Sequence, residues 1–275
     1  GGAAKTLSFW GFFAMTASMV MTVYEYPSFG SAGWALIFFL LLGGIFWFLP
    51  VALCAAEMAT VQGWEKGGLF TWVEKTMGPV WGLAAIFYQW FQITVGFVTM
   101  IYFIVGAWSI AFHWSALNDD VVIKAIATLV IFWVITFSQF GGTKNTARLA
   151  KIGFFVGILA MGIIFFVTSI IYLAQGNPIQ ADFNAKPFIP DFGNIGTLVI
   201  FVSFILAYAG AESSASHVNE MKNPARDYPL VMILLVIVAI VLDALGGFTV
   251  GATIPEKYLG LNTGVIQSFE FLFGH

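Results

Sequence analysis

Cysteine, histidine and charged residues are scarce in this chain of 275 residues. Its single cysteine, Cys54, excludes an intrachain disulfide and a paired-cysteine metal or redox site. Only 9% of the residues are charged, and no basic stripe is present that could support nucleic-acid binding. The chain also lacks a Gly-x-Ser-x-Gly turn, a phosphate-binding loop and a His-Glu-x-x-His pair. We therefore expect no enzyme activity, metal site or cofactor, and no nucleic-acid partner.

Apolar residues are abundant instead, at 60% of the chain, with a mean hydropathy of +0.91. A soluble domain of this size does not have such a composition. Segments long enough to cross the hydrocarbon core, about 30 Å thick, need about 20 residues each. Seven segments qualify: residues 7–29, 33–57, 80–112, 121–140, 152–174, 196–220 and 229–253. The sequence therefore predicts an all-α polytopic protein embedded in a lipid bilayer. A further segment, residues 67–77, has the helical spacing of a short interfacial helix.

The placement of Lys and Arg predicts the orientation of these spans. If the N-terminus is cytoplasmic, eight of the cations fall on the cytoplasmic side and three on the other side. The first group contains Lys5, Lys66, Lys75, Lys144, Arg148, Lys151, Lys222 and Arg226, and the second contains Lys124, Lys186 and Lys257. We therefore expect a cytoplasmic N-terminus.

The sixth span is interrupted by small residues and one acid. Residues 207–216 read AYAGAESSAS, with Gly210 and Glu212 in the middle. An opened helix is tolerated at membrane depth only where protein or a water-filled cavity satisfies its backbone groups. An acid at that depth marks a functional site by default. The alternative is a small-residue surface that only packs against another helix.

The first span has a similar interruption in residues 14–27, AMTASMVMTVYEYP. Two broken helices five spans apart are typical of transporters built from inverted repeats, because an odd number of helices reverses the orientation of the second repeat. We expect residues 1–174 to form the first five-helix repeat, residues 175–195 an external linker, and residues 196–275 the start of the second repeat.

Three motifs suggest a family: TASMVMTVYEYP in the first span, FGGTKNTARLAKIGFF before the fifth, and YAGAESSASHVNEMKNPARDYPL from the sixth into the seventh. Together they resemble the amino acid–polyamine–organocation transporters, and more narrowly the bacterial glutamate/GABA antiporters of acid resistance. The resemblance implies a LeuT-like fold of twelve spans, truncated here after about seven, in the bacterial inner membrane. It also implies exchange of external glutamate for internal GABA (gamma-aminobutyrate) by alternating access, and that this chain alone does not transport.

The resemblance also assigns candidate site residues. Tyr24 matches a substrate-site tyrosine, and Glu212 matches the acid of the broken sixth helix. Tyr208 and Gly210, beside Glu212, complete the predicted substrate site. An exchanger or proton symporter of another amino acid or a polyamine remains an alternative, as does a membrane protein that does not transport.

Two further acids are candidates for gating or coupling. Glu25 follows Tyr24 directly, and Asp243 lies in the seventh span, where the family has a small polar residue. Because a lipid-facing Asp at that depth would be costly, we expect Asp243 to face protein or a water-filled cavity.

Overall fold

The computed structural model describes residues 5–23, 25–30, 32–64, 66–179 and 187–253, together with residues 266 and 272. Within these ranges all regular structure is helical, apart from one isolated parallel bridge between Leu7 and Met221. The predicted all-α class is confirmed.

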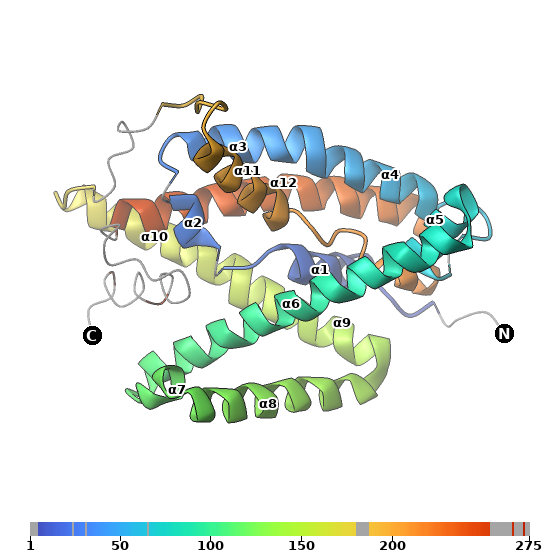
Figure 1. Cartoon of the computed structure of the whole chain (residues 1–275), viewed down its shortest axis with the longest axis horizontal. Coiled ribbons are helices and arrows are strands. Elements are labelled where there is room, and N and C mark those ends of the chain that lie inside the picture. The colour runs from blue at the N-terminus through green and yellow to red at the C-terminus, as the bar shows by residue number, and fades with distance from the viewer. Residues whose placement is uncertain are drawn as a thin grey trace.

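Four continuous helical runs are long and apolar enough to cross a membrane: Ala35–Ala59, Pro79–Ala111, Val121–Ala174 and Pro224–Thr253. The first run consists of α3 (Ala35–Gly43), the π-helical η1 (Gly44–Phe48) and α4 (Leu49–Ala59), the second is α6, and the fourth is α12. The third run reverses its direction between α8 and α9, where Gly142 has a φ of 75°. It therefore forms two separate helical segments (Figure 1). Its parts are α8 (Val121–Ser138), η2 (Gln139–Gly141), α9 (Gly142–Ile152), η3 (Gly153–Ala160) and α10 (Met161–Ala174).

The two predicted interruptions are present. The first span is divided into α1 (Phe9–Val20) and α2 (Tyr26–Gly30), and the described residues between them, 21–23 and 25, are not helical. The sixth is divided into α11 (Ile195–Ala207) and the 3-10 helix η5 (Ala215–Glu220), with turns at residues 208–214. Pro27 is at the second position of α2, where a missing N–H costs no helical hydrogen bond.

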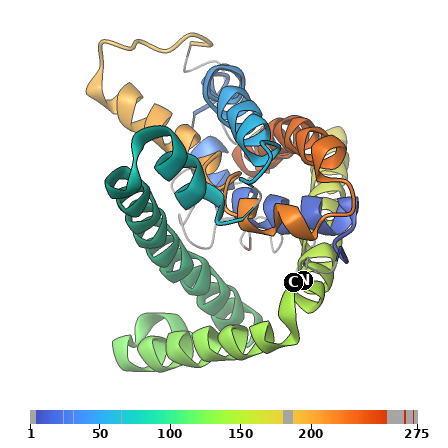
Figure 2. The same ribbon diagram turned by 90° about the vertical axis from the view of Figure 1, so that its right-hand side faces the viewer.

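α12 is the packing centre, with α1, α2, α3, α4 and α10 against it. The main core joins these elements, whereas α6, α7 (Ala116–Asp119) and α8 form a small separate core from Ile101, Val105, Leu117 and Ile131. Figure 2 shows these helices extending away from the rest. The short helix α5 (Gly68–Met77) lies where the sequence predicts a helix over residues 67–77, and it packs on α6.

Glycines bring α2 directly against the backbone of α12. A Cβ added to Gly30 would lie 2.9 Å from the amide nitrogen of Gly251 and 3.0 Å from the carbonyl oxygen of Gly247. Gly247 and Gly251 are four residues apart, which is the spacing that lets membrane helices approach closely. This contact fixes the second half of the first span on the seventh.

Candidate functional site

The two helix interruptions touch each other. Gly210 has a φ of 113°, a conformation that suits glycine, and a Cβ added there would lie 3.2 Å from the carbonyl oxygen of Met19. Met19 is in the last turn of α1. The opened part of the sixth span therefore rests on the end of α1, and small side chains are needed for this approach.

A buried hydrogen bond joins the same two segments. The hydroxyl of Thr16 is hydrogen-bonded to that of Ser214, although 198 residues separate them. The Thr16 hydroxyl also lies 3.0 Å from the carbonyl oxygen of Phe12, to which it donates. Because a hydroxyl has only one proton, Ser214 is then the donor to Thr16.

Glu212 lies in the turns after α11 and is partly buried. Its carboxyl is within electrostatic range of the Tyr228 hydroxyl, at the start of α12 (Pro224–Thr253). Tyr228 is 0% exposed, its ring packs 5.4 Å from that of Phe12, and its hydroxyl has no hydrogen-bond partner within the described part of the chain. Sequence reasoning missed Tyr228, because nothing in the motif DYP reveals an unpaired hydroxyl.

The structure places Tyr208 in a packed position at the end of α11. Its side chain is 1% exposed, and its hydroxyl donates to the carbonyl oxygen of Leu40 at 3.0 Å. Its ring stacks on Phe48, with 4.9 Å between centroids and 9° between planes. The hydroxyl proton is thus used within the protein in this conformation. Tyr24, the other predicted tyrosine, lies outside the described residues.

The two candidate coupling acids, Glu25 and Asp243, are brought near each other. Asp243 is 3% exposed, which confirms the expectation that it faces protein rather than lipid. Tyr26 begins α2 and lies so close to α12 that a Cβ on Gly246 would be 2.5 Å from its ring. Glu25, directly before Tyr26, is consequently within electrostatic range of Asp243. Two carboxylates in such a low-dielectric place repel each other strongly.

A cluster of polar contacts surrounds Glu220 at the end of the broken sixth span. Glu220, the last residue of η5, accepts through one carboxylate oxygen from Thr143 at 3.2 Å, and its other oxygen is 2.7 Å from Nδ1 of His217. Its carbonyl oxygen accepts from the amide of Leu7 at 3.0 Å. Glu220 therefore links the end of the broken sixth span to α9 and to the segment before α1.

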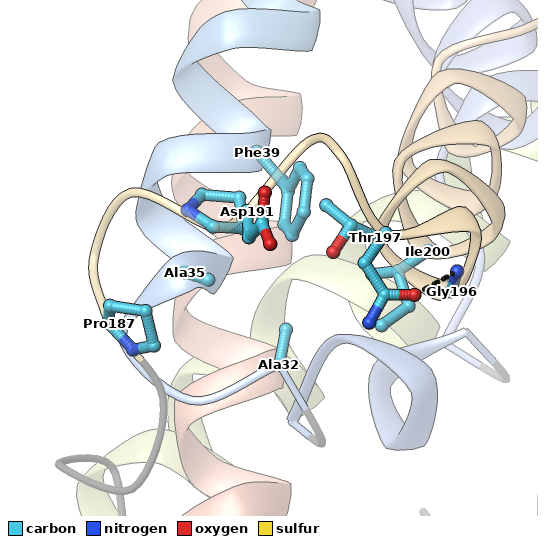
Figure 3. Close-up of a pocket in the computed structure, with 10 residues that line it drawn as sticks. Ala32, Ala35, Phe39, Pro187, Asp191, Gly196, Thr197 and Ile200 are labelled. Carbon is cyan, nitrogen blue, oxygen red and sulfur yellow. Dashed lines mark hydrogen bonds between the residues drawn. The ribbon is translucent and has the colours of Figure 1, made fainter.

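A cavity of about 330 Å³ lies elsewhere, between α3 and the start of α11 (Figure 3). It is lined by Ala32, Ala35, Phe39, Pro187, Pro190, Asp191, Asn194, Gly196, Thr197 and Ile200. Asp191 and Asn194 accept from the amides of Gly193 and Gly196, so they cap local turns. Of the predicted site residues that the structure describes, none lines this cavity. The described residues also contain no group of three or more potential metal ligands.

A family model described as "Amino acid permease" matches residues 7–275, which is nearly the whole chain. The chain belongs to this family. Membership confirms the resemblance inferred from the three motifs, and together with the long apolar helices it makes the protein a multi-pass membrane protein.

Individual relatives of this chain are named as transporters. Two glutamate/gamma-aminobutyrate antiporters from Lactococcus lactis, one in subspecies cremoris and one in subspecies lactis, are each 62% identical to it over 271 residues. That alignment covers 98% of this chain and 54% of each relative. An aspartate/glutamate permease from L. lactis is 27% identical over 253 residues, covering 83% of the chain and 48% of that relative. The chain thus spans about half the length of the curated relatives it matches.

Proposed function

We propose that this chain is part of an antiporter that exchanges external glutamate for internal GABA by alternating access, as in bacterial acid resistance. The supporting relatives are the Lactococcus antiporters, 62% identical over nearly the whole chain. The structural observation that carries the proposal is the contact between the two helix interruptions, at Gly210 and Met19, with Glu212 beside it. We place the protein in the bacterial inner membrane with a cytoplasmic N-terminus, and residues 1–174 and 196–275 in two inverted repeats of a LeuT-like fold.

The chemistry of the interruptions suits a substrate with an ammonium group, which glutamate and GABA share. α1 and α11 both end at the interruptions, and helix C-termini favour cations. The Glu212 carboxylate adds a charged acceptor. We propose that these groups bind the ammonium, with Tyr24, Tyr208 and Gly210 completing the site and Tyr208 releasing Leu40 when substrate binds.

Counterflow in proteoliposomes tests this function. Vesicles that contain the complete protein are loaded with GABA, and uptake of labelled glutamate is measured. We expect rapid uptake that disappears when internal GABA is omitted. Protein-free vesicles provide the control. Uptake that needs no internal GABA would contradict exchange and favour a symporter.

An exchanger of another amino acid is the second candidate, because the aspartate/glutamate permease is also a relative. In the same assay, labelled aspartate and a polyamine are offered to GABA-loaded vesicles. Faster uptake of either one than of glutamate would select this alternative.

We further propose that protonation of Glu25 or Asp243 couples to transport, because one proton on either carboxyl removes their mutual repulsion. Asp243→Asn keeps the shape of the side chain and removes one charge. We expect exchange by this variant to depend less on pH than exchange by the parent. An unchanged pH profile at the parent's rate would show that Asp243 has no coupling role.

A further inference from the structure

Three cations share one face along α9, from its first turn to its last. Lys144, Arg148 and Lys151 are all exposed, and their spacing of four and three residues places them within an arc of about 60° on an α-helix. We call these residues the α9 cation stripe. Ala147, on the neighbouring face, is buried, and a Cβ on Gly11 of α1 would lie 3.7 Å from its Cβ. The stripe therefore follows the edge of the contact between α1 and α9.

No carboxylate of the described residues forms an ion pair with this stripe. Within the described ranges, the only ion pair joins His217 and Glu220. The second oxygen of Glu220 accepts from Thr143, which precedes Lys144 and is therefore about 100° away around the helix. The three positive charges are thus available to a ligand from outside the protein.

The surface next to the stripe is apolar and aromatic. α9 continues into η3 and α10 without a break, and Ile152 and Val156, just beyond Lys151, are 56% and 60% exposed. Trp10 of α1 is 48% exposed, and its ring lies 6.0 Å from that of Phe155. Exposed Trp beside basic residues at the end of an apolar helix is typical of the boundary between lipid headgroups and acyl chains. This arrangement is the one expected of a stripe at headgroup level.

We propose that the α9 cation stripe binds the headgroup of an anionic phospholipid, with its phosphate at Arg148 and its acyl chains along Trp10 and Ile152. Arg binds phosphate through two parallel hydrogen bonds, and the flanking lysines add charge. Each basic residue near an anionic membrane surface contributes about fivefold in affinity. Three residues together contribute roughly 100-fold.

The test uses the complete protein, purified in neutral detergent and titrated with phosphatidylglycerol or phosphatidylcholine. Bound lipid is counted by native mass spectrometry, and thermal unfolding is followed in parallel. We expect phosphatidylglycerol to bind and to raise the unfolding temperature at concentrations at which phosphatidylcholine does neither. Equal effects of the two lipids would overturn the proposal. Glycerol 3-phosphate has the phosphate without acyl chains, and equal stabilisation by it would overturn a lipid site.

Two sets of charge changes distinguish the stripe from general electrostatic attraction. The combination Lys144→Gln, Arg148→Gln and Lys151→Gln should weaken phosphatidylglycerol binding roughly 100-fold. The matched control, Lys66→Gln, Lys75→Gln and Lys222→Gln, removes the same charge from exposed positions elsewhere and should leave binding within a few-fold of the parent. Equal losses in the two sets would contradict a specific site. Arg148→Gln alone, the mildest change, should lose about fivefold, and parental affinity there would also contradict the proposal.

Discussion

Gly210 has a backbone conformation that suits glycine and faces a carbonyl oxygen of the other interrupted helix. Ala17 and Ala211 are both 0% exposed, so small residues line the contact on both sides. The sequence left two interpretations of these residues, an opened helix or a packing surface. The structure combines them, since the small side chains allow the opened segment to pack against α1.

Glu212 is the residue whose change should damage transport most selectively. Glu212→Gln keeps the volume and removes the charge, and a hydrogen bond to a charged group contributes about 1.5–3 kcal/mol. We therefore expect the KM for glutamate to rise at least about tenfold in proteoliposomes, with normal folding.

If the protonated carboxyl of Glu212 is the working form, Glu212→Gln will retain activity at low pH and Glu212→Ala will fail at every pH. Glu57→Gln, at an exposed position near the end of α4, is the control. Exchange by a folded Glu212→Ala variant at the parent's rate and pH profile would remove Glu212 from the site.

Two buried tyrosines differ in whether their hydroxyl has a partner. The Tyr208 hydroxyl donates to Leu40, so Tyr208→Phe should cost about 1 kcal/mol of stability. The Tyr228 hydroxyl has no partner among the described residues, so Tyr228→Phe should leave the protein as stable as the parent or more stable. Thermal unfolding of the two variants in the same detergent checks this. A larger loss for Tyr228→Phe than for Tyr208→Phe would show that Tyr228 has a hydrogen-bond partner in the complete protein.

Single residues were predictable where their own chemistry was unusual for a membrane span. Glu212 and Asp243 stood out as acids, and Gly210 as a glycine among small residues. Thr16 and Ser214 are ordinary in membrane helices, and their hydrogen bond depends on a tertiary contact across 198 residues. The pairing of Glu25 with Asp243 likewise depends on the glycine contact between α2 and α12. No local pattern predicts such contacts.

At the scale of elements, hydropathy predicted the spans because the thickness of the bilayer fixes the length of a helix that crosses it. The interruptions were predictable from small residues and from Pro27. The separation of α6 and α8 from the main core was not, since these helices are as apolar as the others. The role of Glu220 was also missed, because its contacts with Leu7 and Thr143 come from distant segments.

The contact between α2 and α12 should tolerate no side chain at Gly30. Gly30→Ala would place a methyl group 2.9 Å from a backbone nitrogen, and α2 would have to move. Overpacking of this kind typically costs about 1–3 kcal/mol. Gly96 in α6 has open space around its Cβ position, so Gly96→Ala should be neutral or slightly stabilising. Thermal unfolding measures both, and equal stabilities would mean that α2 is not fixed on α12 in the complete protein.

At the scale of the whole molecule, Lys and Arg are distributed unequally between its two ends. The chain segment before α1, the helix α5, the turn from α8 into α9 and the start of α12 lie at one end of the molecule (Figure 1). These segments contain Lys5, Lys75, Lys144 and Arg226. Lys66 and Lys222 lie two residues before α5 and α12, and Arg148 and Lys151 follow along α9. α7 and the start of α8, with Lys124, lie at the opposite end. The cations assigned to one side from the sequence are therefore at one end in space.

This distribution predicts which end faces the cytoplasm, because Lys and Arg are retained on that side during insertion. Cys54 is changed to Ala in a background without other cysteines, and one cysteine is then introduced, at Ser115 just before α7 or at Gln139 in η2. Both positions are exposed. A membrane-impermeant maleimide should label Ser115→Cys in intact cells and Gln139→Cys only after permeabilisation. Because the two positions lie at opposite ends of α8, the reverse result would invert the whole molecule in the membrane, with Glu220 and the α9 cation stripe on the outside.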